Sequence, residues 1–270
     1  MLKTRILTVM VVLPLFAAAL FYLPNGGWGL FLMPLMLAGA WEWGALAGWR
    51  RAARVIYMGA MALAGMGLWY VSGGVAADSR AMNLALFAVS LVFWLIVAAL
   101  WMAKGWRVRS PWVMTVAGLV LLLPLWWALV VMQTRPLQLL ALMAIVWISD
   151  SAAYLCGRLW GRCKLAATIS PGKTWEGVFG ALVGVALYYG LVSAAGLVQS
   201  SILQGAAGFA IFIFLAVLGI EGDLFESWIK RTAGVKDSGV LFPGHGGVLD
   251  RIDALTASMP AAALLLHTAS

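Results

Sequence analysis

Hydrophobic residues occupy nine long stretches of the chain, and short polar or turn-forming segments separate them. The stretches are residues 5–23, 28–48, 53–71, 82–102, 112–132, 137–157, 175–197, 203–228 and 249–268. Each has about the 20 apolar residues that a helix needs to cross the hydrocarbon core of a bilayer, ~30 Å thick. The breaks carry turn-forming residues such as Ser72-Gly73-Gly74 and Ser170-Pro171-Gly172. The pattern predicts an all-α, polytopic integral membrane protein with about nine transmembrane helices.

No internal repeat, low-complexity segment or soluble appendage is evident. We therefore expect a single integral membrane domain over residues 1–270, with N-terminal spans in about 1–135 and a motif-bearing catalytic half in about 136–270. The first residues also resemble a signal peptide, because Lys3 and Arg5 precede an apolar run. That run continues to Leu23 without a polar cleavage region, so we expect a retained first span.

The composition supports a membrane protein. Hydrophobic residues make up 64% of the chain and charged residues 10%, whereas a soluble domain carries about 25% charged residues. The 15 tryptophans fit the same interpretation, since indole rings favour the bilayer interface. The net charge of +8 therefore points to membrane topology, and no nucleic-acid partner is expected. Cys156 and Cys163 match no metal-binding spacing and are expected to be unpaired.

The basic residues predict the orientation. If the N-terminus is cytoplasmic and the spans alternate, sixteen lysines and arginines lie on the cytoplasmic side, and only Arg80 and Arg135 lie outside. Such an asymmetry is the usual mark of cytoplasmic loops. We therefore expect a multi-pass protein with a cytoplasmic N-terminus.

Eight of the ten acidic residues fall within or at the ends of the expected spans, in the cytoplasmic half of each: Glu42, Asp150, Glu176, Glu221, Asp223, Glu226, Asp250 and Asp253. A charge at the bilayer centre costs roughly 2.5–3.5 kcal/mol, so such residues usually face a cavity, pair or perform chemistry. For Glu42 alone, an interfacial charge that reaches water is an equally good interpretation.

Spacing suggests where three of these carboxylates meet. Asp250 and Asp253 are three residues apart and share a helix face, and Asp223 lies four residues before Ser227. The last two helices could therefore present Asp223, Asp250 and Asp253 to one point. Carboxylate oxygens are the ligands of Mg²⁺, often together with substrate phosphates. The scarcity of cysteine and histidine argues against zinc.

The connection between these helices carries positive charge and glycine. Lys230, Arg231 and Lys236 can pair with phosphate oxygens, and the glycines of the segment around Gly246 and Gly247 allow backbone N–H groups to approach an anion. A metal–phosphate site is the favoured interpretation, and a polar loop with internally paired charges is the alternative. For His245, phosphate contact or loop structure is favoured over a role as general base.

A second polar cluster precedes the seventh stretch. The letters GKT at Gly172–Thr174 suggest a P-loop, but that motif needs a glycine at position 167, which is alanine, and we expect no strand before it. Ser170 or Thr174 is expected to cap the helix that follows. A helix N-terminus beside Lys173 is also suited to an anion, although the local sequence favours the simple cap.

Together these segments resemble a known family. Ser227-x-x-Lys230-Arg231, Lys236-Asp237-x-Gly239 and Phe242-Pro243-Gly244-His245-Gly246-Gly247-x-x-Asp250-Arg251-x-Asp253 resemble the signature of phosphatidate cytidylyltransferases, or CDP-diacylglycerol synthases. The segments Asp150 to Gly157 and Ser170 to Gly177 are also similar to the family. In the first 135 residues the resemblance is limited to hydropathy and Glu42.

The resemblance implies a reaction in which CTP and phosphatidate give CDP-diacylglycerol and pyrophosphate, with Mg²⁺ and with a second cation left open. It also implies a homodimer in a bacterial-type cytoplasmic (inner) membrane, with a cytoplasmic active site. It implies catalytic roles for Asp223, Lys230, Arg231, Lys236, Asp237, His245, Asp250 and Asp253. Substrate phosphates are expected at Ser170, Lys173, Gly246, Gly247 and Arg251, and metal at Asp223, Asp250 and Asp253, with Asp150 as a weaker candidate.

Two other classes of function remain open from the sequence. One is a related membrane transferase or kinase that uses CTP on another lipid, such as a polyprenol. A CDP-alcohol phosphatidyltransferase is less well supported, because its DGxxAR element is absent. The other class is an organic-anion transporter. Transporters usually place their site near the bilayer midplane, whereas these acids cluster toward one face.

Overall fold

The structure is a computed structural model that describes residues 2–73, 79–241 and 246–268. Within these residues the expected stretches are helical: α1 (Leu2–Tyr22), α2 (Asn25–Leu46), α3 (Arg51–Val71), α4 (Arg80–Val92), η2 (Phe93–Ala98), α5 (Ala99–Ala103), α6 (Pro111–Met132), α7 (Pro136–Trp160), α8 (Trp175–Ala194), η3 (Ser201–Leu203), α9 (Gly205–Thr232) and α10 (Leu249–Thr268). The segments α4, η2 and α5 follow one another without a break. The prediction of a nearly all-α protein is confirmed.

Seven of the described helices are long and apolar enough to cross a membrane. They are α2, α3, the continuous segment Arg80–Ala103, α6, α7, α8 and α9. In α10, Asp250, Arg251 and Asp253 lie close together in the first turns, and much of the rest of that helix is buried by protein rather than exposed to lipid. The arrangement is that of a multi-pass membrane protein, and the count of nine spans stays a prediction.

A short β-hairpin precedes α8, so the expectation of no strand there was wrong. Strand β1 (Lys164–Ala166) pairs antiparallel with β2 (Ser170–Thr174), which continues directly into α8. The two strands have only three and five residues, too few for a periodic pattern to reveal. The expected cap is present, because the Thr174 side chain accepts a hydrogen bond of 3.1 Å from the Gly177 backbone N–H.

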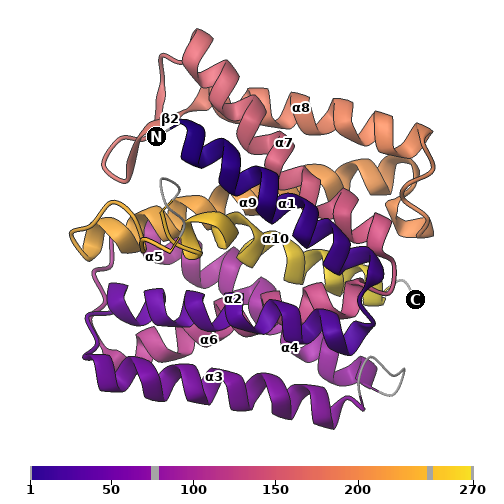
Figure 1. Ribbon diagram of the computed structural model, residues 1–270. Helices are drawn as coiled ribbons and strands as arrows, with labels where there is room; N and C mark the ends of the chain where they lie inside the picture. Colours follow the sequence, from indigo (N-terminus) through magenta and orange to yellow (C-terminus); the bar gives the residue numbers. More distant parts are fainter. Residues whose placement is uncertain (1, 74–78, 242–245, 269–270) are drawn as a thin grey trace.

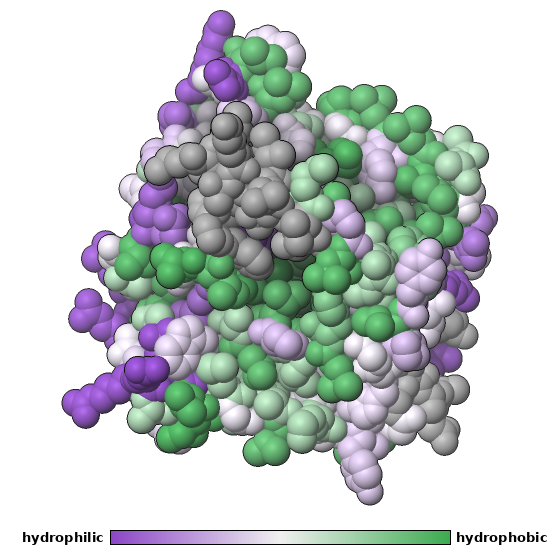
Figure 2. Space-filling view, in the orientation of Figure 1, coloured by the Kyte–Doolittle hydropathy of each residue, from purple (hydrophilic) through white to green (hydrophobic). Residues whose placement is uncertain are grey.

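The main helices alternate in direction, so the connections gather at two ends of the bundle (Figure 1). We call one the polar end; it contains residues 47–50, 104–110, 161–174, 233–241 and 246–248. The opposite end contains residues 23–24, 72–73, 133–135 and 195–204. Figure 2 shows hydrophilic residues mainly along the left edge, which in Figure 1 is the side of the β-hairpin and of the α9–α10 connection. The charge asymmetry of the sequence is thus an asymmetry of the folded molecule.

Helix α10 lies in the middle of the bundle (Figure 1). It packs against α9 and α7, and also against α4 and α6, so it joins the N-terminal helices to the C-terminal ones. Its buried stretch, Ala254 to Ala263, consists mostly of Ala, Ser and Thr, and small side chains let neighbouring helices approach closely. This packing fixes the position of the acidic first turn of α10 at the polar end.

Several tryptophans lie in the core rather than at the bilayer interface. Trp28, Trp94 and Trp127 are fully buried, which corrects the simple interfacial interpretation for these residues. Each indole N–H has a partner: Trp28 donates to the Leu129 carbonyl at 3.0 Å, and Trp127 donates to Asn83 Oδ1 at 2.7 Å. Buried tryptophan is stable when its N–H is satisfied in this way.

Candidate active site

A cavity of about 580 Å³ opens at the polar end, between α7, the β-hairpin, α8, α9 and α10. It brings together nine residues that the sequence singled out: Asp150, Ser170, Lys173, Asp223, Lys230, Asp237, Asp250, Arg251 and Asp253. Tyr154, Thr174 and Gly177 also line it. Two motif regions that are far apart in the sequence therefore share one cavity.

The β-hairpin supplies a lysine to this cavity. Strand β2 carries Lys173, whose Nζ lies 2.7 Å from Asp223 Oδ2 on α9. The other carboxylate oxygen of Asp223 accepts a hydrogen bond of 3.4 Å from Ser227, one turn later on the same helix. The hairpin thus places a positive charge directly against a candidate metal ligand.

Lys230 was expected in a water-accessible loop, and the structure corrects this. Helix α9 continues to Thr232, so Lys230 lies in its last turn, where a cation is favoured by the helix dipole. Its side chain is only 11% exposed. Its Nζ pairs with Glu226, one turn earlier, and lies 2.6 Å from Asp250 Oδ1. The buried ion cluster binds the end of α9 to the start of α10.

Asp250 is held by the connection that precedes it. Its Oδ2 accepts hydrogen bonds from the Ser238 backbone N–H at 2.9 Å, from the Ser238 hydroxyl at 2.9 Å and from the Gly247 N–H at 2.8 Å. Gly246 has a φ of +82°, and a Cβ there would lie 2.6 Å from Asp250 Oδ2. Glycine is therefore required for the chain to fold around this carboxylate. Through these hydrogen bonds Asp250 holds the loop in place, whether or not it also binds a ligand.

Asp253 has different surroundings. One of its oxygens accepts a hydrogen bond of 2.8 Å from the Ala254 N–H, and the residue lies within electrostatic reach of Asp150, Asp223 and Glu226. A group of carboxylates at the wall of one cavity favours a bound cation. Oxygen donors without cysteine or histidine suit a hard ion such as Mg²⁺. In the described part of the chain, no three acidic, histidine or cysteine side chains already have a metal-binding arrangement.

Glu42 is the residue whose importance sequence reasoning missed. It lies on α2 and is only 5% exposed, so the interpretation as an interfacial charge in water is wrong. Its carboxylate accepts hydrogen bonds from the Val248 N–H at 3.0 Å and the Leu249 N–H at 2.9 Å, and it shares the single Ser238 hydroxyl proton, at 3.0 Å, with Asp250 Oδ2. It therefore caps the N-terminus of α10 and fixes the loop that holds Asp250.

Two glycines of the connection make room for Glu42. A Cβ at Gly239 or Gly247 would collide with its carboxylate. The contact joins residues 196 to 207 positions apart, so no local spacing could reveal it. The sequence offered two signals: a glutamate stands inside an apolar stretch, and the family resemblance of the first 135 residues includes it.

Some predicted site residues lie away from the cavity. Arg231 is exposed, and its guanidinium donates to the backbone carbonyls of Ile169 and Val235 at 3.3 and 3.2 Å, which ties α9 to the β-hairpin. Lys236 is exposed in the loop and is not among the residues of the cavity wall. Gly246 and Gly247 contact Asp250 rather than the cavity. His245 lies outside the described residues.

The structure also shows the surroundings of the two cysteines and of two further glutamates. Cys156 and Cys163 are unpaired, as predicted. Glu176 accepts hydrogen bonds from the Cys163 backbone N–H at 3.1 and 3.2 Å, so it fastens the hairpin to the first turn of α8. Glu226, which the sequence placed only among the intramembrane acids, is a direct partner of Lys230.

The fold and the cavity define a multi-pass helical protein with a charged site at one end of the bundle. Comparison with known proteins gives the family. The cytidylyltransferase family model matches residues 3–269, so the chain belongs to the cytidylyltransferase family, whose members are nucleotidyltransferases.

Two named relatives match nearly the full length of the chain, and a third matches part of it. The chain is 37% identical over 277 residues to the phosphatidate cytidylyltransferase of Pseudomonas aeruginosa, covering 100% of this chain and 98% of that protein. It is 32% identical over 282 residues to the phosphatidate cytidylyltransferase of Haemophilus influenzae, with 96% of each covered. The enzyme of the same name from Brucella suis is 46% identical over 127 residues, 46% of this chain and 43% of that protein.

Proposed function

We propose that the protein transfers the cytidylyl group of CTP to phosphatidate, giving CDP-diacylglycerol and pyrophosphate in phospholipid biosynthesis. The observation that carries this proposal is the cavity that joins both motif regions within a chain similar to phosphatidate cytidylyltransferases over its full length. The cavity lies at one end of an apolar bundle, where a water-soluble nucleotide and a bilayer lipid can both reach it.

The chemistry requires one bond to form and one to break. A phosphate oxygen of phosphatidate attacks the α-phosphorus of CTP, and the bond from that phosphorus to the oxygen bridging to the β-phosphate breaks, so the electron pair leaves with pyrophosphate. The nucleophile is already an anion, so a general base contributes little. The barrier comes from charge repulsion and alignment, which Lys173, Lys230 and Arg251 at the cavity wall are suited to reduce.

We propose Mg²⁺ as the cofactor, held by Asp223 and Asp253 together with Asp150, and with Asp250 as a further candidate. These residues line the cavity and supply the oxygen donors that the ion prefers. When bound, the ion supplies positive charge against the phosphates and the leaving pyrophosphate. Asp223, which pairs with Lys173, would hold the ion through its carboxylate, and Lys173 would then be available to a substrate phosphate. A second cation remains part of the proposal, as does a homodimer.

The direct test is turnover by the purified protein. Radiolabelled CTP and phosphatidate should give labelled CDP-diacylglycerol and one pyrophosphate per turnover, in a reaction abolished by a chelator. A polyprenol or polyprenyl phosphate in place of phosphatidate should give no product; product from it alone would assign a different lipid substrate. Uptake of an organic anion into vesicles without any product would indicate a transporter.

The topology gives a second prediction. We propose a bacterial cytoplasmic membrane location with nine spans, and with the N-terminus and the polar end in the cytoplasm. Reporter fusions at Arg51, Arg107, Lys164 and Lys236 should read cytoplasmic, and fusions at Arg135 and Ser200 external, because sixteen of 18 basic residues fall on the proposed inner side. A cytoplasmic signal at Ser200 would disprove this arrangement.

A further inference from the structure

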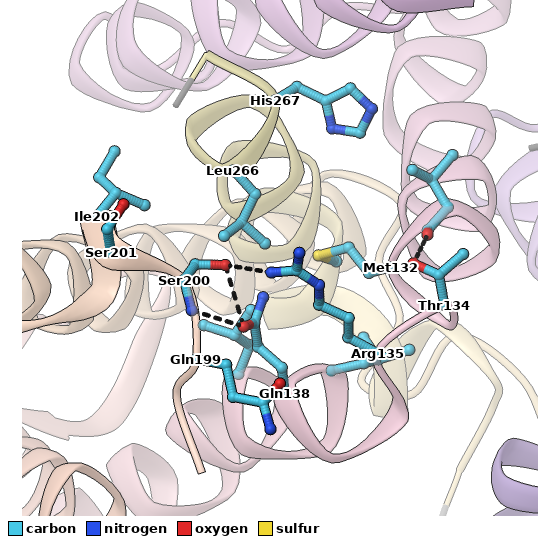
Figure 3. A pocket seen from close by; sticks show the side chains of 13 residues that line it. Met132, Thr134, Arg135, Gln138, Gln199, Ser200, Ser201, Ile202, Leu266 and His267 are labelled. Carbon is cyan, nitrogen blue, oxygen red and sulfur yellow. Dashed lines mark hydrogen bonds between the residues drawn. The ribbon is translucent and has the colours of Figure 1, made fainter. Parts of the chain in front are cut away.

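A second cavity, of about 600 Å³, lies at the opposite end of the bundle (Figure 3). It is bounded by the α6–α7 turn, by residues 199–202 and by the end of α10. Arg135, Gln138 and Ser200 give it a polar side, and Leu139, Leu142 and Leu266 give it an apolar wall. The proposed reaction assigns it no role, because its wall shares no residue with the cavity at the polar end.

Hydrogen bonds join Arg135, Ser200 and Gln138 at the cavity wall. Arg135 Nη1 donates to the Ser200 hydroxyl at 2.8 Å, and that hydroxyl donates to Gln138 Oε1 at 3.2 Å. The Ser200 backbone N–H lies 3.4 Å from the same oxygen. Since a backbone N–H can only donate, this contact fixes the amide with Oε1 toward Ser200 and Nε2 away from it.

Arg135 and Gln138 keep donors for a ligand. The Gln138 Nε2 and the outer edge of the Arg135 guanidinium both face the open space below Leu266 in Figure 3. Gln138 is 5% exposed, so protein atoms rather than bulk water surround its amide. Among the residues that line the cavity, Arg135 is the one guanidinium and no aspartate or glutamate accompanies it, so the wall favours a ligand that carries negative charge.

Arg135 is unusual in its position. It is one of only two basic residues expected on the outer side, where lysine and arginine are otherwise depleted. The three ion pairs among the described residues all lie at the polar end and do not include it. Its planar fork of donors matches the geometry of a phosphate group.

We propose that this cavity binds the phosphate group of an anionic membrane phospholipid, at the end of the bundle opposite the active site. The donors would hold the phosphate, and the adjoining leucines would contact the glycerol and the first methylenes of the acyl chains. An apolar wall beside the donors favours an amphiphile over a free phosphate ion, which loses hydration there without gaining apolar contact.

The test is lipid retention by the purified full-length protein, measured by native mass spectrometry. The probe is dioleoyl-phosphatidylglycerol, with dioleoyl-phosphatidylcholine and inorganic phosphate as comparisons. Phosphatidate is avoided because the active site is proposed to bind it. Arg135→Gln should weaken phosphatidylglycerol binding about tenfold or more, as expected for loss of a charge-assisted hydrogen bond. Arg109→Gln, which removes an exposed arginine of the polar end, is the control and should bind normally.

Gln138→Glu separates binding from folding. A glutamate can still accept from Ser200, but its second oxygen replaces the outward N–H₂ and repels a phosphate. It also gains a partner in Arg135, so the melting temperature should hold or rise while lipid retention falls. Equal binding by the wild type and Gln138→Glu would overturn the proposal, as would equal weakening by Arg109→Gln. Equal retention of phosphatidylcholine, or displacement of the lipid by equimolar inorganic phosphate, would overturn the assignment to an anionic lipid.

Discussion

The two ends of this bundle hold cavities of nearly equal volume, about 580 and 600 Å³, with opposite electrostatic designs. At the polar end, carboxylates and cations face one another, and Lys173 and Lys230 pair with Asp223 and Asp250. At the opposite end, Arg135, Ser200 and Gln138 satisfy one another's acceptors and leave donors outward. The volume of a cavity therefore says little about its ligand, whereas the charged and polar groups of its wall indicate which charge the ligand carries.

The difference also separates binding from chemistry. A site with both signs of charge can hold a metal ion and phosphates together. A bound nucleotide can also replace an internal ion pair there. The cavity at the opposite end has an arginine and no aspartate or glutamate in its wall, so it is suited to bind an anion but offers no carboxylate for a metal ion. We therefore place the group transfer at the polar end and only lipid binding at the other.

The largest effect is expected within the acidic cluster. Asp253→Asn removes a carboxylate that lies near other acids, so it should lower turnover about 10²–10³-fold without loss of folding stability. Activity measured against Mg²⁺ and Mn²⁺ concentration, alongside the melting temperature, tests this, and excess metal should restore part of the activity.

Asp250→Asn is the matched comparison. It breaks a largely buried pair with Lys230, whose side chain is 11% exposed, and weakens the loop bonds to Ser238. Loss of one partner of a buried pair typically costs about 3–5 kcal/mol, so this variant should lose melting temperature and yield together with activity, and excess metal should restore less of its activity than in Asp253→Asn. If Asp253→Asn retains full activity at ordinary Mg²⁺, the metal assignment fails.

A smaller effect is expected at the hairpin. Lys173→Ala removes the partner of Asp223 and a proposed phosphate contact, so kcat/KM for CTP should fall about 10–100-fold. Lys173→Arg keeps the charge and should recover part of the loss. Unchanged kinetics in Lys173→Ala would mean that its ion pair with Asp223 only stabilises the hairpin.

Sequence reasoning located the helices well, because an apolar stretch of about 20 residues is a signal that few other structures share. It also found most of the cavity wall, since Asp250 and Asp253 carry a recognisable spacing. It failed where partners are distant or segments short. The bond from Glu42 to Leu249 spans 207 positions, and strand β1 has only three residues. The burial of Lys230 depends on how far α9 extends, which local propensity does not determine.

A substitution at Glu42 tests whether this residue positions the start of α10. Glu42→Gln places an amide where three donors converge, so one hydrogen bond is lost and two donors face each other. The cost should be about 1–3 kcal/mol in unfolding free energy, seen as a lower melting temperature. Turnover per folded molecule should fall severalfold while KM for CTP stays nearly constant, because Glu42 acts through α10. Glu221→Gln is the control, since Glu221 Oε1 is buried without a hydrogen-bond partner among the described residues. A Glu42→Gln protein as stable and active as Glu221→Gln would contradict this role.

The smallest effect is expected at Lys236. Its side chain is exposed in the α9–α10 connection and lies outside the cavity wall, although the sequence marked it as a site residue. An exposed charge attracts CTP through water and ions, which screen it beyond about 10 Å at 0.1 M salt. Lys236→Ala should therefore raise KM for CTP about two- to threefold at low ionic strength, and the difference should vanish in 0.5 M salt. Lys173→Ala should keep its defect in the same salt, because its contact with phosphate would be direct. A defect in Lys236→Ala that is large and independent of salt would place this lysine on the substrate, and the loop would then have to close over the cavity during turnover.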